Sequence, residues 1–430
     1  MKQHLKLKLA REATVTKIPY WQDIIHDKPM AQISIEPEID RILSKFNLPV
    51  WQTREYKPAL KTWDTTEINS GLNRIYRLIL QRNTSIPPLL IAEISLLPIV
   101  EEVSIARIGQ SDLPSMEVMQ MSLNTDRRSR QAIYLHKAHQ FSQGDPRIIV
   151  AVLDTGLDLD HSEYKDNLLP GYDFVNIIDG ANQFVGDYLD YDEIPEDEVG
   201  HGTHVAGIIA GKGINMPVGV VPKCRILPVR VLGAMQRGGK KVGAGLVDNI
   251  NAGIKWAIDR GANVINMSLG IEHTGGGLPH QEVVDYAKLR NVTIVAASGN
   301  DGREKLYYPG ALPHVIAVGA ADETRRVASF STYGKQVDLI APGTDIYSTH
   351  INNEYAFSTG TSHASPFVAG AIALLKSYAL EKGVKLVDHQ VKYLLKHSSD
   401  KIDSRFKHKK AGFGQLNLQD ALRLLDYKLS

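Results

Sequence analysis

The sequence predicts an α/β protein: a three-layer αβα domain with a mostly parallel, doubly wound sheet, preceded by a small α+β domain. Two observations predict this class. From about residue 145 onward, continuous apolar stretches alternate with stretches of helical period, and strands buried on both faces are typical of parallel sheets. Before about residue 120 the pattern is less regular. We place the boundary in a polar connector, between an N-terminal region 1–118 and a larger domain 119–430.

The N-terminal region carries four secondary-structure signals: an amphipathic helix at 36–49, an alternating strand at 73–82, a helix opening at Pro87–Pro88 and a strand at 99–108. The first 65 residues otherwise match no pattern that we can assign. Within them, residues 51–63 (WQTREYKPALKTW) are interpreted as a candidate recognition surface.

The larger domain has five continuous apolar stretches that predict buried strands: 147–154, 225–232, 263–270, 291–300 and 314–322. Helical segments lie between them, for example at 246–261 and 280–291. This alternation predicts right-handed crossovers and helices on both faces of the sheet. In such a sheet the loops at the carboxyl ends of the strands carry the chemistry.

Composition narrows the class of protein. The chain has 430 residues, of which 43% are hydrophobic and 23% charged, as in ordinary globular proteins. A formal net charge of +1 gives no reason to expect nucleic acid or an anionic membrane as the main partner. The single cysteine, Cys224, excludes an internal disulfide framework and fits a reducing compartment. We see no signal peptide and no apolar run of about 18 residues, so we expect a cytoplasmic protein without a membrane span.

Three polar side chains stand at predicted strand–helix junctions. Asp154 closes a buried strand, His201 lies at the start of a helix rich in small residues, and Ser362 precedes a long apolar helix. Taken singly, each is explained as a cap or turn residue. His201 and His204 also form an HxxH pair, but the third ligand and the general base of a zinc-binding helix are missing. Together, the order Asp, His, Ser is that of the subtilisin type of catalytic triad.

The chain resembles the subtilases, the family of subtilisin-like serine peptidases, over roughly residues 130–430. Three motifs carry the resemblance: Asp154-Thr155-Gly156, the stretch HGTHVAG at 201–207, and Gly360-Thr361-Ser362 followed by Ala364-Ser365-Pro366. Four further stretches agree with it: VRVLG (229–233), NMSLG (266–270), AASGN (296–300) and GFGQLN (412–417).

The resemblance implies a serine endopeptidase that works through an acyl-enzyme and needs no cofactor for its chemistry. A serine hydroxyl is a poor nucleophile, so Ser362 would need His201 as its base, with Asp154 orienting the ring. The Asn300 side chain and the Ser362 backbone N–H would stabilise the oxyanion. An esterase of the α/β-hydrolase type would need the G-x-S-x-G motif and the order Ser, Asp, His. A catalytically silent peptide-binding protein is the other alternative.

The family also implies where a peptide substrate would lie. An extended chain would bind between two edges, Gly243-Ala244-Gly245 and Ser268-Leu269-Gly270, although 243–245 could instead be a flexible loop. Substrate contacts are also expected at Ser298, Gly299 and Tyr307, the last at the base of the primary specificity pocket. A bulky Tyr307 would favour small residues at the cleaved position, whereas Asp301 at the rim would attract Lys or Arg. The sequence leaves both readings open.

A structural calcium site is also expected. Residues 187–198 (DYLDYDEIPEDE) hold seven carboxylates, and hard cations prefer several carboxylate oxygens. The resemblance adds Glu163, so that the candidate ligands are Glu163, Asp187, Asp190 and Asp192. The alternative is a solvated acidic loop.

Two further expectations follow from the resemblance. The N-terminal region would be a pro-domain, an intramolecular inhibitor and folding aid, with an autoprocessing site between about residues 107 and 126. The alternative is a permanently attached regulatory domain. His363 replaces the family's methionine after the nucleophile, and it would either only pack differently or, as a second titratable group, alter the pH profile.

Overall fold

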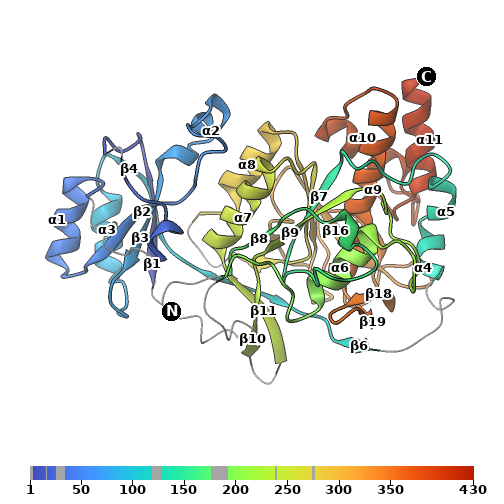
Figure 1. The fold of residues 1–430 in the computed structure, drawn as a ribbon, viewed down its shortest axis with the longest axis horizontal. Coiled ribbons are helices and arrows are strands. Elements are labelled where there is room, and N and C mark those ends of the chain that lie inside the picture. The colour runs from blue at the N-terminus through green and yellow to red at the C-terminus, as the bar shows by residue number, and fades with distance from the viewer. Residues whose placement is uncertain are drawn as a thin grey trace.

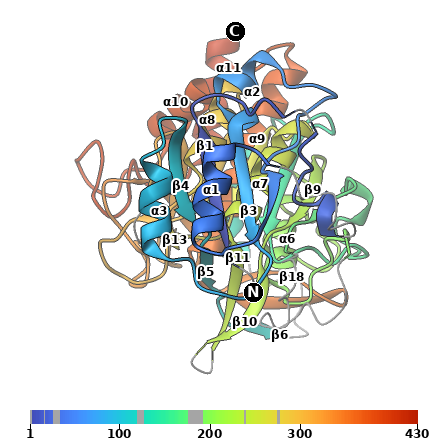
Figure 2. The ribbon, with the colours of Figure 1, turned by 90° about the vertical axis from the view of Figure 1, so that its left-hand side faces the viewer.

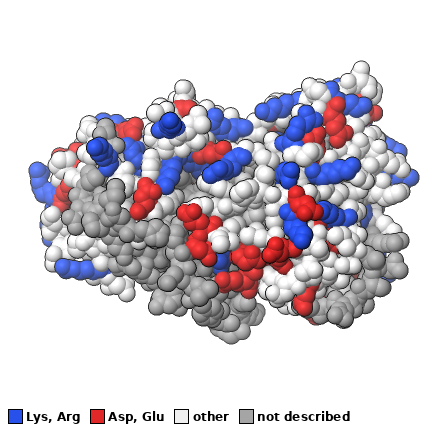
Figure 3. All heavy atoms as spheres, viewed as in Figure 1, with Lys and Arg blue, Asp and Glu red and all other residues white. Residues whose placement is uncertain are grey.

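The computed structural model describes residues 3–15, 17–25, 34–118, 127–175, 192–237, 240–273 and 277–430. The N-terminal region lies beside a larger α/β part (Figure 1). Among the described residues, no helix combines the length and apolar content that crossing a bilayer requires. On the face seen in Figure 3, acidic side chains gather in a band at the centre, and basic side chains lie mostly above it and to its right.

A seven-stranded parallel sheet forms the centre of the larger part, in the order β17-β16-β14-β12-β7-β9-β8. Its strands are β7 (Ile149–Asp154), β8 (Tyr172–Asp173), β9 (Arg225–Arg230), β12 (Val264–Met267), β14 (Thr293–Ala297), β16 (Val315–Ala321) and β17 (Val337–Pro342). The five predicted strands are all present, and the predicted class is confirmed. The sequence analysis did not assign β8 and β17.

Helices cover both faces of this sheet. Successive residues of each strand point to opposite sides, so each strand contributes side chains to two cores. Val150 and Val152 of β7 belong to one core, and Ala151 and Leu153 belong to the other. The first face carries α5 (Leu135–Ala138), α6 (His201–Ala210), α9 (Thr361–Glu381), α10 (Asp388–Ser398) and α11 (Leu418–Leu429). The second face carries α7 (Val247–Asp259) and α8 (Gln281–Leu289).

The N-terminal region folds around an antiparallel sheet in the order β2-β3-β1-β4. Its elements are β1 (His4–Leu9), α1 (Pro37–Lys45), β2 (Val50–Arg54), α2 (Thr65–Asn69), β3 (Ile75–Leu80), α3 (Pro88–Ser95) and β4 (Val100–Ile105). Helices α1 and α3 cover one face of the sheet (Figure 2). Every residue of β3 is buried: Tyr76, Leu78 and Leu80 pack under these helices, and the alternate residues face the larger part.

The interpretation of residues 51–63 as a recognition surface is wrong for its first half. Trp51 to Arg54 form buried positions of β2, and Tyr56 is buried against the larger part. The sheet needs this strand to pair with β3. Only the end of the segment, with Leu60 77% exposed, lies at the surface.

Buried charges attach the N-terminal sheet to α7 and α8. The Arg77 guanidinium donates to Glu55 at 2.6 and 2.8 Å and to Asn249 of α7 at 2.8 Å. His4 Nε2 lies 2.8 Å from Asp248 of α7. Lys6 forms ion pairs with Asp248 and with Glu282 of α8. Buried charges of this kind stabilise an interface only while every partner is present.

We expect Arg77→Ala to lower the free energy of unfolding by about 3–5 kcal/mol, because it leaves the Glu55 carboxylate buried without a cation. Denaturant unfolding followed by circular dichroism measures this. The double variant Arg77→Met, Glu55→Gln removes both charges and should lose much less. Equal losses in the two variants would contradict the ion-pair explanation.

Candidate active site

Asp154 and His201 form a buried pair at the carboxyl end of β7. His201 is the first residue of α6, and its Nδ1 lies 2.6 Å from Asp154 Oδ1, with both side chains almost inaccessible to solvent. The Thr155 backbone N–H donates to the same carboxylate oxygen at 2.8 Å. The start of α6 comes so close to β7 that a Cβ on Gly202 would lie 2.1 Å from the Gly156 carbonyl oxygen. Glycine is therefore required beside His201.

The Asp154 carboxylate sets the protonation of His201. Burial alone would disfavour the charged ring, but the charge and the hydrogen bond of Asp154 outweigh burial and raise the pKa of His201 above its ordinary value. His201 therefore holds a proton more firmly than a free imidazole does. Such a ring is suited to accept a proton and to return it.

Ser362 is the second residue of α9 and lines the same cavity as Asn300. Its Oγ donates to the Ser268 carbonyl oxygen at 3.1 Å. His201 Nε2 has no hydrogen-bond partner among the described residues. The Asp154–His201 contact is therefore formed, whereas the Ser362 hydroxyl bonds to the segment after β12 and makes no hydrogen bond to His201.

Asn300 follows β14, and Thr361 fixes the orientation of its amide. Asn300 Oδ1 accepts from the Thr361 backbone N–H and from the Thr361 hydroxyl, both at 2.9 Å. The Nδ2 group of Asn300 is then the part of the amide that remains to donate a hydrogen bond. Thr361 was not among the predicted site residues, although its place inside the Gly-Thr-Ser motif was a signal.

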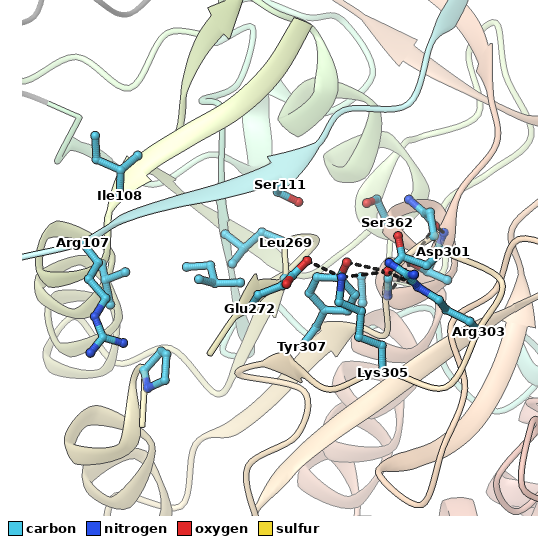
Figure 4. Close-up of a pocket in the computed structure, with 18 residues that line it drawn as sticks. Arg107, Ile108, Ser111, Leu269, Glu272, Asp301, Arg303, Lys305, Tyr307 and Ser362 are labelled. Carbon is cyan, nitrogen blue, oxygen red and sulfur yellow. Dashed lines mark hydrogen bonds and ion pairs between the residues drawn. The ribbon is translucent and has the colours of Figure 1, made fainter. Parts of the chain in front are cut away.

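A cavity of about 430 Å³ opens beside Ser362 (Figure 4). Of the predicted substrate residues, Leu269, Gly270, Gly299 and Tyr307 line it. Two others are placed differently. Ser298 Oγ donates to the Thr332 carbonyl at 2.9 Å. The buried Ser268 Oγ donates to the Ser362 carbonyl at 2.7 Å and supports the first turn of α9.

The predicted edge Gly243-Ala244-Gly245 lies in β11 (Lys240–Leu246), which pairs with β10 (Gly233–Arg237) on one side. On its other side it pairs antiparallel with β5 (Ile108–Asp112) of the chain itself. Gly109 of β5 also lies against Ile271, directly after the second predicted edge. An extended segment of this protein therefore lies between the two predicted edges.

After β5 begins, the same extended segment continues past Ser362 in space. Ser111 lines the cavity with Ser362, and the two side chains face the same space in Figure 4. A Cβ on Gly360 would lie 2.9 Å from the Pro114 ring. Beyond it, β6 (Met116–Val118) pairs with β19 (Glu354–Ser358), the partner of β18 (Ile346–His350). We call residues 108–118 the crossing segment; Figure 1 shows its second strand, β6, at the lower edge of the larger part.

His363 packs as a buried neutral ring. It lies against His204, with ring centroids 4.4 Å apart, and its nitrogens have no hydrogen-bond partner among the described residues. Burial, aided by the neighbouring histidines, holds the pKa of His363 well below its ordinary value. The packing and the lowered pKa of His363 favour the expectation that it only packs differently, and its effect on the pH profile stays a prediction. His204 Nε2 contacts the Ile346 and Ala356 carbonyls.

The environment of Glu163 does not suit a cation. Its carboxylate accepts from the backbone N–H groups of Gly213, Ile214 and Asn215 at 2.7–3.1 Å. Donors converge on it, whereas a calcium site needs converging oxygens. Asp192 is exposed, Asp187 and Asp190 lie outside the described residues, and the described residues contain no cluster of three potential ligands. A calcium site in the acidic loop stays a prediction.

The fold and site define a serine hydrolase with its polar groups at the carboxyl edge of a parallel sheet. The family model described as the subtilase family matches residues 145–417, and the chain belongs to that family of subtilisin-like serine endopeptidases. The chain is 38% identical to the thermophilic serine proteinase of Bacillus sp. (strain AK1) over 295 residues, which are 68% of this chain and 66% of that one.

Two further comparisons agree. The major intracellular serine protease of Bacillus subtilis (strain 168) is 40% identical over 240 residues, 54% of this chain and 70% of that protein. The structure of the prenylagaramide maturation protease PagA aligns with a TM-score of 0.55 and 31% identity, and the alignment covers 68% of this chain and 98% of that one. The predicted family, fold class and enzyme class are thereby confirmed.

We expect kcat/KM to fall on the acid side with a midpoint above about pH 6.5, because the reaction needs neutral His201 and Asp154 raises its pKa above that ordinary value. Activity should therefore be present above the raised pKa and be lost as pH falls through it. A pH profile with a short peptide substrate measures the midpoint.

His363→Met is the matched control. It should leave the acid midpoint unchanged, because His363 is already neutral there. A shifted midpoint, or a loss of turnover above about a hundredfold, would show that His363 has a direct role.

Proposed function

We propose that this protein is a serine endopeptidase whose nucleophile is Ser362, whose base is His201 and whose N-terminal region, residues 1–118, restrains it. The observation that carries the proposal is the Asp154–His201 contact, which lies close to the start of α9: the His201 ring is 5.6 Å from the ring of His363, the residue after Ser362. Ser362 in turn lines a cavity with Leu269 and Gly270 of one predicted edge. Protein or peptide chains in extended form would be the substrates.

In the first half of the reaction, Ser362 Oγ leaves the Ser268 carbonyl by rotation of its side chain and hydrogen-bonds to His201 Nε2. His201 accepts the proton as Oγ bonds to the scissile carbonyl carbon. Asp154 stabilises the imidazolium that forms. His201 then protonates the leaving amine, the C–N bond breaks, and an acyl-enzyme remains on Ser362.

In the second half, a water molecule gives a proton to His201 and attacks the ester, and the Ser362–acyl bond breaks as Oγ regains its proton. Both tetrahedral intermediates carry an oxyanion that needs donors. The Asn300 Nδ2 group, held by Thr361, and the Ser362 backbone N–H at the start of α9 would supply them. The start of a helix also favours nearby negative charge.

The crossing segment would act as the intramolecular inhibitor. Its strand β5 pairs with β11, so a substrate strand cannot add to that edge at the same time. Ser111 and Ile108 line the cavity that holds Ser362. Ser111 lines the cavity with Ser362 and Pro114 lies against Gly360, so the stretch from Ser111 to Ser115 would be the place of any autoprocessing.

A catalytically silent peptide-binding protein is the alternative, and the buried Asp154–His201 contact argues against it, since a silent protein gains nothing from a raised histidine pKa. The location of the protein in the cytoplasm stays a prediction. One relative is named an intracellular protease.

We expect a fluorophosphonate to label Ser362 in the wild type and not in Ser362→Ala, as read by intact mass and peptide mapping. Asn300→Ala should still be labelled but should lose about 10²–10³ in turnover, because one oxyanion donor is missing. Labelling at another residue, or full turnover in Asn300→Ala, would contradict the proposed roles.

We expect Gly109→Leu to speed labelling of Ser362 at least tenfold, because a Cβ on Gly109 would lie 2.2 Å from Ile271 Cδ1 and would push β5 away. Adding Ile271→Ala makes room for the new side chain and should restore slow labelling. Equal labelling rates in all variants would show that the crossing segment does not restrain the site. Intact mass of the active species then tells whether the N-terminal region is removed or retained.

A further inference from the structure

The connection between α10 and α11 carries a concentration of positive charge. Residues 396–410, which we call the basic segment, contain six lysine and arginine residues and two aspartates, in a chain whose formal net charge is +1. Both aspartates already face cations of the chain: Asp400 forms an ion pair with Arg325, and Asp403 forms one with Arg405. They therefore leave most of the lysine charge of the basic segment uncompensated.

Four lysines of the basic segment are held by aromatic rings instead of carboxylates: Lys396, Lys401, Lys407 and Lys410. The first two lie over Phe406 and Phe413, at 4.9–5.6 Å from the ring centroids. Lys407 lies 5.0 Å from the Phe413 centroid, and Lys410 lies 4.7 Å from the Tyr333 centroid. Among the described residues, no carboxylate lies within ion-pair distance of these four ammonium groups. A ring positions a cation without neutralising its charge.

Like charges in the basic segment are held close together. The Lys401 ammonium donates to the Phe413 carbonyl at 2.7 Å and contacts the Lys396 carbonyl at 3.4 Å, so it is fixed beside that lysine. Burial and the charge of Lys396 lower the pKa of Lys401 below its ordinary value. An anion bound here would relieve this repulsion. A partner can reach the place, because Phe406 is 53% exposed and Lys401 lies at the surface.

The basic segment adjoins the rim of the cavity that Ser362 lines. Arg303 lines that cavity, and its carbonyl accepts from the Tyr333 N–H at 3.1 Å. On the other side of this loop, the Gly334 N–H donates to the Lys409 carbonyl at 3.2 Å. The rim, the loop at Tyr333 and the end of the basic segment therefore lie side by side.

We propose that the basic segment is a second binding site for protein substrates, which holds an acidic stretch of the substrate outside the catalytic cavity. The inference rests on the proposed function, because it assigns a substrate feature to the same peptidase. Position favours a polypeptide as the occupant, since a chain that enters the cavity lies close to this surface. Charge complementarity selects aspartate and glutamate side chains, which would face the lysines that have no carboxylate.

Binding is measured first without catalysis, in the Ser362→Ala variant of the full chain. The probe is a fluorescent peptide of alternating Glu and Gly, read by anisotropy at low salt. The same peptide with Gln in place of Glu should bind at least tenfold more weakly. Lys407→Glu combined with Lys410→Glu should weaken binding of the acidic peptide at least tenfold, and raising the salt to about 0.5 M should do the same, because salt screens exposed charges.

Lys17→Glu combined with Lys61→Glu is the matched control. It changes the net charge of the chain equally, at exposed lysines of the N-terminal region, which lies away from α10 and α11 (Figure 1). This variant should bind the acidic peptide as tightly as the unchanged chain does. Equal weakening in the two double variants would overturn the inference. Tighter binding of single-stranded DNA, or of vesicles of anionic lipid, than of the acidic peptide would overturn it as well.

Catalysis then tests the effect on hydrolysis, in enzyme carrying Gly109→Leu. Two substrates share one cleavage sequence and differ only in a run of Glu or Gln, which a flexible linker joins to either side of that sequence. In at least one of the two orders, the Glu substrate should have a kcat/KM at least fivefold higher, through a lower KM and an unchanged kcat. Lys407→Glu with Lys410→Glu should remove this difference, and equal KM values for the Glu and Gln substrates in both orders would contradict the inference.

Fluorophosphonate labelling of Ser362 separates the two possible failures. Labelling and hydrolysis without binding of the acidic peptide refute only the inference. Binding of the acidic peptide without labelling or hydrolysis refutes the proposed function.

Discussion

The Asp154 carboxylate is buried at the end of β7, and much of the site follows from what holds it there. A buried carboxylate is costly unless it is paired, and His201 and the Thr155 N–H provide the pairing. The Asp154 carbonyl in turn accepts from the N–H groups of Val231 and Leu232, directly after β9. The chain that continues from there forms β10 and β11, so the same residue orients His201 and anchors the start of the ribbon that holds the predicted edge.

The nucleophile depends on close packing of backbones in the same way. Ser268 accepts from the Ser362 hydroxyl through its carbonyl and donates to the Ser362 carbonyl through its own hydroxyl. A small residue permits a second close approach, between α6 and β18, where a Cβ on Gly207 would lie 2.3 Å from Thr349 Oγ1. Two walls of the cavity, after β12 and after β14, are thereby fixed to the first turn of α9. The position of Ser362 and the shape of the cavity beside it are therefore set together.

The sequence predicted the features that depend on local pattern. The parallel strands are continuous apolar runs, and the catalytic side chains follow them at recognisable motifs. Strand β1 was missed, although Leu5, Leu7 and Leu9 alternate as a half-buried strand should. The strand β5 could not have been predicted in this way, because Ile108–Asp112 (IGQSD) has no apolar alternation. Its extended form comes from pairing with an edge more than 100 residues later in the chain.

The cavity beside Ser362 shows the same dependence on distant partners. Tyr307 and Asp301 pointed to different substrates in the sequence, and in the structure the Asp301 carboxylate faces Lys305 and Arg303 of the chain itself. The crossing segment presents small residues where it faces this cavity, with Gly109 against Ile271 and Ser111 among the lining residues. In the proposed function the crossing segment lies where a substrate would lie, so its residues there would be subject to the same limits of space as those of a substrate.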